Sequence, residues 1–310
     1  MRIVALAGGV GGAKLAHGLA QVLAPHELTI IVNTADDFQH LGLHVSPDLD
    51  TVCYTLAGKA SSRTGWGRRG ETWNALSGLE ELGGPTWFRL GDRDLATHLE
   101  RTRRLQSGEP LSQIVREFSQ AWGIEHRILP MTDSAVRTIV RTDAGDLDFQ
   151  VYFVERRCEP HVTGFEFRGA AKSAPAPGVM ESLEGADGVI VCPSNPWVSI
   201  GPILAIPGIQ AAVRSRKALA VSPIIGGEAV RGPAAKMYRE LGIGPSALAV
   251  AEQYRDLASL FVLDEIDSHL ERQIHNLGLR TLVTKTLMQT PADRRRLARH
   301  VLDFLQEMQK

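Results

Sequence analysis

The sequence is poor in cysteine, and the few cysteines it has are scattered. Cys53, Cys158 and Cys192 are odd in number and lie far apart in a chain of 310 residues. A disulfide framework needs paired cysteines and a structural zinc site needs closely spaced ones, so neither is indicated. We therefore expect free thiols in a reducing compartment, the cytoplasm.

Long apolar runs and an excess of one charge are missing as well. No apolar run approaches the roughly 18–20 residues that span a bilayer. The N-terminal MRIVALAGG passes directly into glycines without the pattern of a signal peptide. The formal charge of −1 argues against general electrostatic attraction to nucleic acid or to an anionic membrane. We expect small-molecule partners, with no nucleic acid and no membrane.

The chain does contain the alternation of short apolar runs and helical spacing that is typical of a parallel sheet. An apolar run at 2–6, a helical spacing from Lys14 to Leu23 and another run at 27–33 predict a β-α-β unit. The pattern returns in later apolar runs, at 188–192, 218–221, 260–263 and 281–283. We therefore expect an α/β fold around a parallel sheet.

The middle of the sequence breaks this alternation. Residues 55 to about 125 are polar, rich in glycine and mainly helical in pattern. VRTIVRT and LDFQVYFVE then flank an Asp-Ala-Gly-Asp turn and predict a β-hairpin. The expected organisation is a nucleotide-binding core of residues 1–54 and 170–310, with a helical lobe and hairpin inserted at 55–169.

The first strand leads into the glycine turn, GGVGGAK at residues 8–14. As a Walker A loop it is incomplete, because Ala13 replaces the second glycine and Leu15 replaces the hydroxyl residue. As a dinucleotide fingerprint that starts at Gly9 it is also incomplete, because Lys14 stands at the last glycine. The sequence therefore matches neither of the two common glycine-loop motifs.

The physical properties that these motifs share are nevertheless present. Glycines allow close approach of the backbone, and the N-terminus of the following helix favours an anion. The alternative is a tight strand-to-helix turn without a ligand. Asn33 and Thr34 end the second strand, where an NAD enzyme would carry an acidic residue. We expect a phosphate-containing ligand here, with contacts from Gly8, Gly9, Gly11, Gly12, Lys14, Asn33 and Thr34.

An acidic segment follows the second strand, where open α/β sheets place their ligands. Residues 33–58 hold four aspartates and two histidines. Carboxylates in such a position suit Mg²⁺, which combines a few of them with phosphate oxygens and water. We expect Asp48 and Asp50 as metal ligands and Asp36 as a substrate contact. Asp50 is the stronger candidate for ligand or general base, because Asp48 can instead cap the following helix.

The segment RLGDRDLATH, residues 89–98, adds positive charge. Arg89 and Arg93 could bind phosphate, while Asp92 or Asp94 could hold the arginines or cap a helix. A solvated helix start is the alternative. We take Arg89 as catalytic and Asp92 and Arg93 as substrate contacts.

Polar residues also follow the later strands. Ser194 and Asn195 lie between two prolines and offer a hydroxyl and an amide for a base or ribose, or form an Asx-type turn. The remaining candidate contacts are Thr132, Gly226 and Gly227. No G-x-S-x-G elbow is present, which argues against covalent acyl chemistry. Carboxylates for a metal and arginines for charge are the equipment of phosphoryl transfer.

The order of these segments resembles the 2-phospho-L-lactate transferase family over essentially the full chain. The resemblance rests on GGVGGAKL, NTADD, SPDLDTVCYTLAG, LGDRDLATH, LPMTD, PSNPWVSIGPILAIPG and SPIIGGEAVRGPAAK. It implies a Rossmann-like, three-layer fold with an inserted lobe, Mg²⁺ dependence and often a homodimer. It also implies a role in coenzyme F420 biosynthesis.

The family joins a guanylylated phosphoacid to Fo, a hydroxy-deazariboflavin, and releases GMP. Its donors carry a lactyl, enolpyruvyl or glyceryl group, and no residue in this sequence decides among them. The resemblance places the glycines of 8–12 at the nucleotide diphosphate. It places Asp50 and Arg89 at the Fo side and Asn195 at the guanosine.

Two other functions are compatible with a glycine turn on this fold. A sister family of non-catalytic regulators binds nucleotide sugars, and binding of a UDP-sugar without a deazaflavin would favour that function. An NAD-dependent oxidoreductase is disfavoured, because one glycine and the ribose-binding acid of the fingerprint are missing. The segments around Asp50 and Asp92 favour the transferase.

Overall fold

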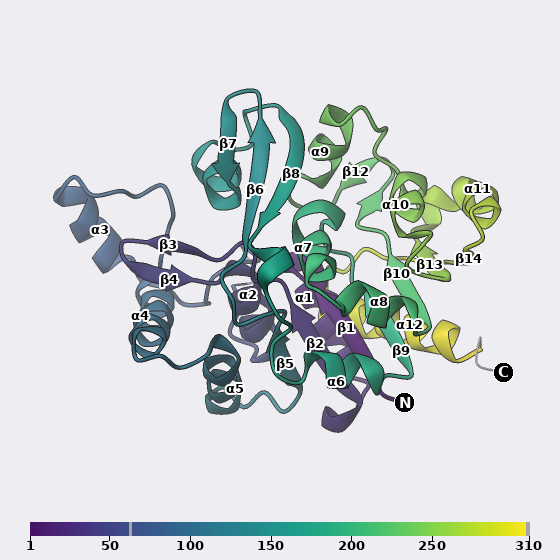
Figure 1. The fold of residues 1–310 in the computed structure, drawn as a ribbon, viewed down its shortest axis with the longest axis horizontal. Helices are drawn as coiled ribbons and strands as arrows, with labels where there is room; N and C mark the ends of the chain where they lie inside the picture. The colour runs from purple at the N-terminus through teal and green to yellow at the C-terminus, as the bar shows by residue number, and fades with distance from the viewer. Residues whose placement is uncertain (62–63, 308–310) are drawn as a thin grey trace.

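A seven-stranded parallel sheet forms the centre of the computed structural model, which describes residues 1–61 and 64–307 (Figure 1). The strand order is β14-β13-β10-β9-β1-β2-β5. The strands are β1 (Ile3–Ala7), β2 (Leu28–Val32), β5 (Arg127–Pro130), β9 (Gly188–Val191), β10 (Ala218–Val221), β13 (Leu260–Leu263) and β14 (Arg280–Val283). The chain fills the sheet outward from β1 in one direction and then from β9 in the other. This is the doubly wound order of a Rossmann-like fold.

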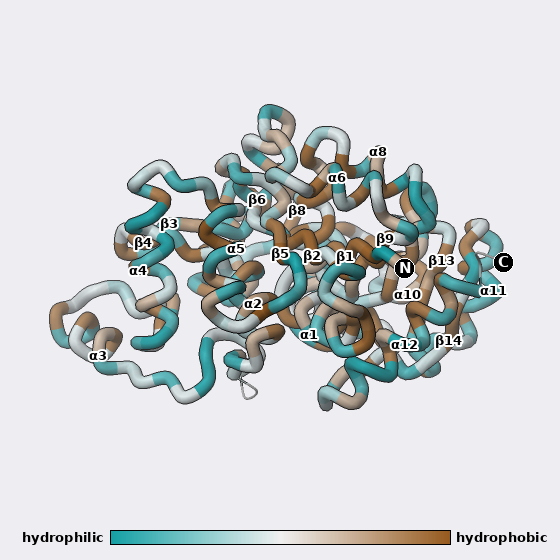
Figure 2. The backbone as a smooth tube through the Cα atoms, turned by 90° about the horizontal axis from the view of Figure 1, so that it is seen from below, coloured by the Kyte–Doolittle hydropathy of each residue, from teal (hydrophilic) through white to brown (hydrophobic). Residues whose placement is uncertain are grey.

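Helices cover both faces of this sheet. The strands are buried on both sides, which is why they appear in the sequence as continuous apolar runs. In β1, Ile3 and Ala5 face one layer while Val4 and Leu6 face the other. Figure 2 shows these central strands mostly brown, the apolar colour. The expected three-layer α/β architecture is confirmed.

The two helical layers come from different parts of the chain. The first consists of α1 (Gly9–Ala20), α2 (Pro47–Leu56), α5 (Leu111–Ala121) and α12 (Pro291–Glu307). The second includes α6 (Val179–Glu184), α7 (Gly201–Ala205), α8 (Ile209–Arg214), α9 (Ala234–Glu240), α10 (Ala247–Tyr254) and α11 (Glu271–Asn276). Within the described ranges, no helix is both long and apolar enough to cross a membrane.

The middle of the chain is mainly helical, as expected, but it also supplies one edge of the main sheet. It contains α3 (Asn74–Glu81) and α4 (Asp92–Gln106), with a small hairpin, β3 (Phe38–His40) and β4 (Leu43–Val45), just before it. β5 pairs in parallel with β2. Its four residues RILP end in proline and are too short to stand out as an apolar run, so the pattern shows no strand there.

A separate three-stranded sheet has the order β7-β6-β8 (Figure 1). β6 (Arg137–Thr142) and β7 (Gly145–Asp148) form the hairpin expected around Asp-Ala-Gly-Asp. The expectation that VYFVE continues the second strand is wrong, because residues 151–155 form a π-helical turn. Phe149 and Tyr152, three residues apart, turn together into a small core with Val140. β8 (Val162–Arg168) takes the other edge of β6.

Candidate active site

The order in which the chain adds strands to the parallel sheet reverses between β1 and β9, and a cavity opens beside the carboxyl ends of these two strands. Gly8 follows β1, and Ser194 follows β9. Open α/β sheets bind their ligands at such a switch point. The cavity measures about 790 Å³, within the range of small-molecule sites. Its walls also include residues from α2, α4 and the segment after β7.

The glycine turn packs tightly against other parts of the protein. Helix α1 begins at Gly9, with Gly8 at its N-cap. A Cβ atom on Gly8 would lie 2.6 Å from both Asp48 Oδ2 and Ser199 Cβ, and one on Gly11 would lie 2.2 Å from the Pro193 carbonyl oxygen. The glycines therefore let α1 meet α2 and the loop after β9. Packing within the protein accounts for them in addition to any ligand.

Two polar residues after β9 hold this junction. The Ser194 hydroxyl accepts a hydrogen bond from the Gly8 amide at 3.0 Å and donates to the Gly8 carbonyl oxygen at 2.8 Å. The Asn195 side-chain oxygen accepts from the Trp197 and Val198 amides, which is the Asx-type cap that the sequence left as an alternative. Both residues line the cavity, but the Ser194 hydroxyl is already used within the protein.

Lys14 and Arg231 bring positive charge to the same wall. The Lys14 amine donates to the Met288 carbonyl oxygen at 2.7 Å. Burial, with the nearby charges of Arg294 and Arg231, lowers the pKa of Lys14. The Arg231 guanidinium donates to the Thr64 carbonyl oxygen. An anionic ligand beside the glycine turn would find two cations there.

Asn33, at the end of β2, holds one of two carboxylates beside the glycine turn. Its amide donates to Asp48 Oδ2 at 3.0 Å, and its side-chain oxygen accepts from the Ala35 amide. Burial, and then the charge of Asp48, raises the pKa of Asp36 well above its usual value. Burial likewise raises the pKa of Asp48 to about 6, although the Asn33 amide and the Gly9 backbone lower it. Such a buried acidic pair is stabilised by a cation or by a proton.

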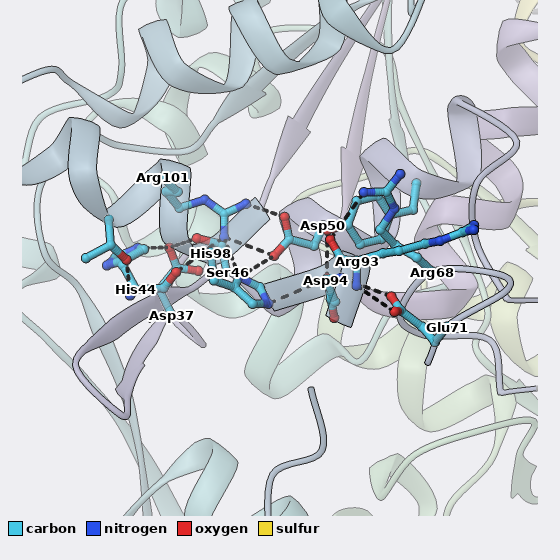
Figure 3. A network of polar contacts seen from close by, with 12 residues as sticks. Asp37, His44, Ser46, Asp50, Arg68, Glu71, Arg93, Asp94, His98 and Arg101 are labelled. Carbon is cyan, nitrogen blue, oxygen red and sulfur yellow. Dashed lines mark hydrogen bonds and ion pairs between the residues drawn. The ribbon is translucent and has the colours of Figure 1, made fainter. Parts of the chain in front are cut away.

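Asp50 has a different environment, shown in Figure 3. The Arg101 guanidinium, from α4, donates from both terminal nitrogens to the two carboxylate oxygens of Asp50, from α2. The Arg101 side chain is 2% exposed and that of Asp50 is 8% exposed. A bidentate pair of this kind is the strong form of a charged hydrogen bond. Both oxygens of Asp50 are therefore engaged within the protein.

A second carboxylate of this wall, Asp94, comes from the first turn of α4. The Tyr54 hydroxyl donates to Asp94 Oδ1 at 2.7 Å. His98 lies between the two acids, with Nε2 at 3.5 Å from Asp94 Oδ1 and Nδ1 at 3.8 Å from Asp50 Oδ2. Asp94, His98 and Arg101 are spaced i, i+4 and i+7 on α4, so they share one side of the helix. We call these three residues the inner face of α4.

Aromatic side chains supply a large apolar part of the lining. They are Tyr54, Trp66, Trp87, Phe88, Phe149 and Phe153. Trp87 and Phe88 contact each other at 5.7 Å between ring centroids, and Phe88 packs edge-on against Phe38 at 4.8 Å. The Arg89 guanidinium lies over the Trp73 ring, 4.6 Å from its centroid. Planar aromatic rings are well suited to bind another ring by stacking.

The carboxylates of the cavity differ in how well they could bind a divalent cation. Among residues 1–61 and 64–307, no three His, Cys, Asp or Glu side chains are grouped to hold a metal. Mg²⁺ commonly uses one or two carboxylates and completes its shell with phosphate oxygens and water. Asp36 Oδ1 is buried without a hydrogen-bond partner, and Asp36 and Asp48 both line the cavity. These two residues fit Mg²⁺ better than Asp50, whose oxygens Arg101 already occupies.

The predicted site residues divide into two groups. Those that line the cavity are Gly8, Gly9, Gly11, Lys14, Asp36, Asp48, Asp50, Arg89, Ser194 and Asn195. Those outside the lining are Gly12, Asn33, Thr34, Asp92, Arg93, Thr132, Gly226 and Gly227. The first group brings the glycine turn, the acidic segment, Arg89 and the loop after β9 together, as the sequence predicts.

Several residues of the second group have other tasks. The Asp92 carboxylate accepts from the Asn74 and Ala75 amides and so caps α3, while the Thr132 hydroxyl donates to the Ala174 carbonyl oxygen. Gly226 and Gly227 both have positive φ, as a two-residue hairpin turn between β11 (Ile224–Ile225) and β12 (Glu228–Ala229) requires. Their glycine pattern therefore reflects a turn.

Asp94, His98 and Tyr54 were not predicted to be in the site, and their contacts show why. The signal was present in DLATHLER, where acid, imidazole and guanidinium fall at helical spacing. The choice between Asp92 and Asp94 depends on which side of α4 faces α2. That orientation follows from the cap at the start of α4, where the Asp94 and Arg93 amides donate to the Glu71 carboxylate.

Comparison with known proteins gives a consistent assignment. The family model described as 2-phospho-L-lactate transferase CofD matches residues 3–300. The 2-phospho-L-lactate transferase of Methanothermobacter thermautotrophicus is 42% identical over 301 residues, covering 97% of both chains. The phosphoenolpyruvate transferase of Kitasatospora aureofaciens is 42% identical over 317 residues, covering 99% of both. That of Thermobifida fusca is 45% identical over 282 residues, covering 86% of this chain and 88% of the relative.

A solved structure supports the fold alone. A member of the UPF0052 family from Bacillus halodurans superposes with a TM-score of 0.62 at 13% sequence identity. The match covers 97% of this chain and 98% of the other. At this identity the likeness extends to the arrangement of strands and helices.

Proposed function

The chain belongs to the 2-phospho-L-lactate transferase family, and on that premise we propose that it moves a phosphoacid from a guanosine diphosphate conjugate to Fo. It is a transferase of coenzyme F420 biosynthesis. The proposed reaction forms a phosphodiester with the terminal ribityl hydroxyl of Fo and releases GMP. The non-catalytic regulator and the oxidoreductase are not supported by the family match.

The observation that carries this proposal is the combination of surfaces in one cavity. Its wall joins a helix N-terminus with glycines, four aspartates and a group of aromatic side chains. A diphosphate, a divalent cation and a flat tricyclic ring need these three kinds of surface. We assign the glycine turn, Lys14 and Arg231 to the diphosphate, and Trp87 and Phe88 to the deazaflavin ring.

On the acceptor side we place Asp50 and Arg89, as the resemblance implies. Both line the cavity, and Arg89 lies on the same chain segment as the aromatic residues Trp87 and Phe88. Arg101 fixes the orientation of Asp50 through both of its carboxylate oxygens, so that this side chain is held rigidly on the acceptor side. Asn195 lines the cavity beside the glycine turn and remains our candidate for guanosine recognition.

We propose Mg²⁺ as the cofactor, held by Asp48 together with Asp36. Bound there with the donor, it would neutralise charge on the diphosphate, as in other phosphoryl transfers. Lys14 and Arg231, which also line the cavity, would add to this neutralisation of the diphosphate charge. The wall that Asn33 and the Gly9 amide build around Asp48 keeps its carboxylate facing the turn.

Two further properties follow from the resemblance and are proposed with it. We expect a homodimer in the cytoplasm. Sedimentation equilibrium of the purified protein measures the first property, and a monomer at micromolar concentration would contradict it.

The donor is the open choice within this proposal. Relatives named for phospholactate and for phosphoenolpyruvate match the chain at the same 42% identity. The test therefore offers both donors, and the phosphoglyceryl donor, with Fo and Mg²⁺, and reads the product by mass spectrometry. We expect one phosphodiester adduct of Fo together with GMP. A chain that binds a UDP-sugar and makes none of the three adducts would be a regulator instead.

A further inference from the structure

Four aspartates line the cavity, and their surroundings differ enough to separate their tasks. They are Asp36, Asp48, Asp50 and Asp94. A carboxylate that takes a proton from a substrate needs a free oxygen within hydrogen-bond reach of that substrate. The hydrogen-bond partners of each acid therefore decide which of them can act in this way.

Asp50 and Asp48 are both engaged. Arg101 donates to the two oxygens of Asp50. Asp48 accepts from Asn33 at one oxygen and is also held by the Gly9 backbone. Asp36 Oδ1 is buried without a hydrogen-bond partner, but the proposed function already assigns this carboxylate to Mg²⁺.

Among the described residues, donors contact only one of the two oxygens of Asp94. Oδ1 accepts from the Tyr54 hydroxyl at 2.7 Å and faces His98 Nε2. In the part of the chain that the structure describes, no side chain or amide donates to Oδ2. The nearest atom to a Cβ built on Gly67 is this Oδ2, at 3.9 Å, and Gly67 also lines the cavity. The free oxygen thus lies along the wall.

On the inner face of α4, Arg101 sets the tautomer of His98, which lies beside the other oxygen of Asp94. Arg101 Nη1 lies 3.2 Å from His98 Nδ1. A guanidinium can only donate, so Nδ1 is the acceptor and the proton of the neutral ring is on Nε2. That N–H faces Asp94 Oδ1 (Figure 3). His98 therefore has no lone pair left for a substrate, and its Nε2 lies 3.5 Å from Asp94 Oδ1 as a donor without another partner among the described residues.

We propose that Asp94 is the catalytic residue that accepts the proton of the attacking hydroxyl; this rests on the proposed function. The acceptor oxygen forms a bond to the phosphorus that carries the phosphoacid. The bond from that phosphorus to the bridging oxygen breaks, and its electron pair leaves with GMP. The hydroxyl proton moves to Asp94 Oδ2 and passes to solvent after product release. His98 and Tyr54 act through Asp94 as positioning residues.

The test compares two neighbouring aspartates of α4. In Asp94→Asn, the side-chain oxygen can still accept from the Tyr54 hydroxyl, while the group facing the cavity becomes a donor. We expect kcat to fall by about 10²–10⁴-fold, the usual contribution of a general base. The dissociation constant for Fo, followed by its fluorescence, should change less than about threefold. Asp94→Glu, which retains a carboxylate, should recover part of the lost rate.

Asp92→Asn is the matched control. Asp92 lies two residues away on the same helix, outside the cavity lining, and caps α3. We expect it to keep the wild-type kcat. If the wild type forms product and Asp94→Asn keeps more than about a third of the wild-type kcat, Asp94 is not the proton acceptor. If the wild type itself forms no product, the proposed function fails, which is a separate result.

Discussion

The glycine turn and the inner face of α4 border the same cavity, but the first lacks side chains and the second carries long charged ones. At the turn, missing side chains let three segments meet, and a single added carbon on Gly11 would lie 2.2 Å from a carbonyl oxygen. On α4, long charged side chains fill the space, and Arg101 is buried against Asp50. The first region is specified by steric fit and the second by charge pairing. Substitutions should therefore affect them in different ways.

The largest effect is expected on the α4 side. Arg101→Ala would leave Asp50 buried without its partner, and breaking such a pair costs about 3–5 kcal/mol. Urea unfolding of the two proteins measures the change. Arg103→Ala is the control on the same helix, because Arg103 pairs with Glu100 at the surface, with a side chain that is 65% exposed. We expect little change there. Equal losses in both variants would contradict the assigned role of burial.

A smaller loss is expected at the glycine turn. Gly11→Ala forces a shift of α1 or of the loop after β9, because the clashing atom is backbone. Overpacking of this kind costs about 1–3 kcal/mol. Gly78→Ala is the matched substitution in α3, where nothing lies within 4 Å of the added carbon. It should stabilise the protein by about 0.5–1 kcal/mol, since alanine favours a helix. Opposite signs in thermal unfolding would confirm the contrast.

Some strands of the fold can be predicted from the sequence, and others cannot. β1, β2, β9 and β10 are buried on both faces, so their apolar runs indicate a parallel sheet directly. β5 was not predicted, because its four residues, RILP, form too short an apolar run. Its place in the sheet depends on pairing with β2, which is distant in sequence. The hairpin at β6 was predictable from its turn, whereas the third strand, β8, was not.

The smallest effect concerns pH and the acidic pair beside the glycine turn. Asp48 has a folded pKa of about 6, above the unfolded value of about 3.9. Its contribution to stability is therefore complete below about pH 4 and is lost as the pH rises through about 6. We expect the Tm of the wild type, relative to Asp48→Asn, to fall by a few degrees across this window. Scanning calorimetry measures it.

A constant difference between the two proteins from pH 4 to pH 7 would contradict the raised pKa. Added Mg²⁺ should also distinguish the two proteins. At pH 7 it should raise the Tm of the wild type more than that of Asp48→Asn, because the variant lacks one proposed ligand.

The candidate site was predictable to the extent that its residues follow strands. Gly8, Asp36 and Asn195 each lie shortly after a strand end, where the topology of a parallel sheet gathers ligand-binding groups. Gly226 and Asp92 form a hairpin turn and a helix cap, which use the same residue types as a ligand site. Only tertiary structure separates these uses.

The crystal structure of Asp94→Asn with Fo and a guanosine diphosphate donor tests the central claim most directly. We expect the deazaflavin ring against Trp87 and Phe88 and the diphosphate beside the glycine turn. We further expect the terminal ribityl oxygen within about 3.2 Å of the side chain at position 94. A ribityl oxygen beyond hydrogen-bond reach of that side chain, or guanine in place of the deazaflavin on the aromatic wall, would contradict it.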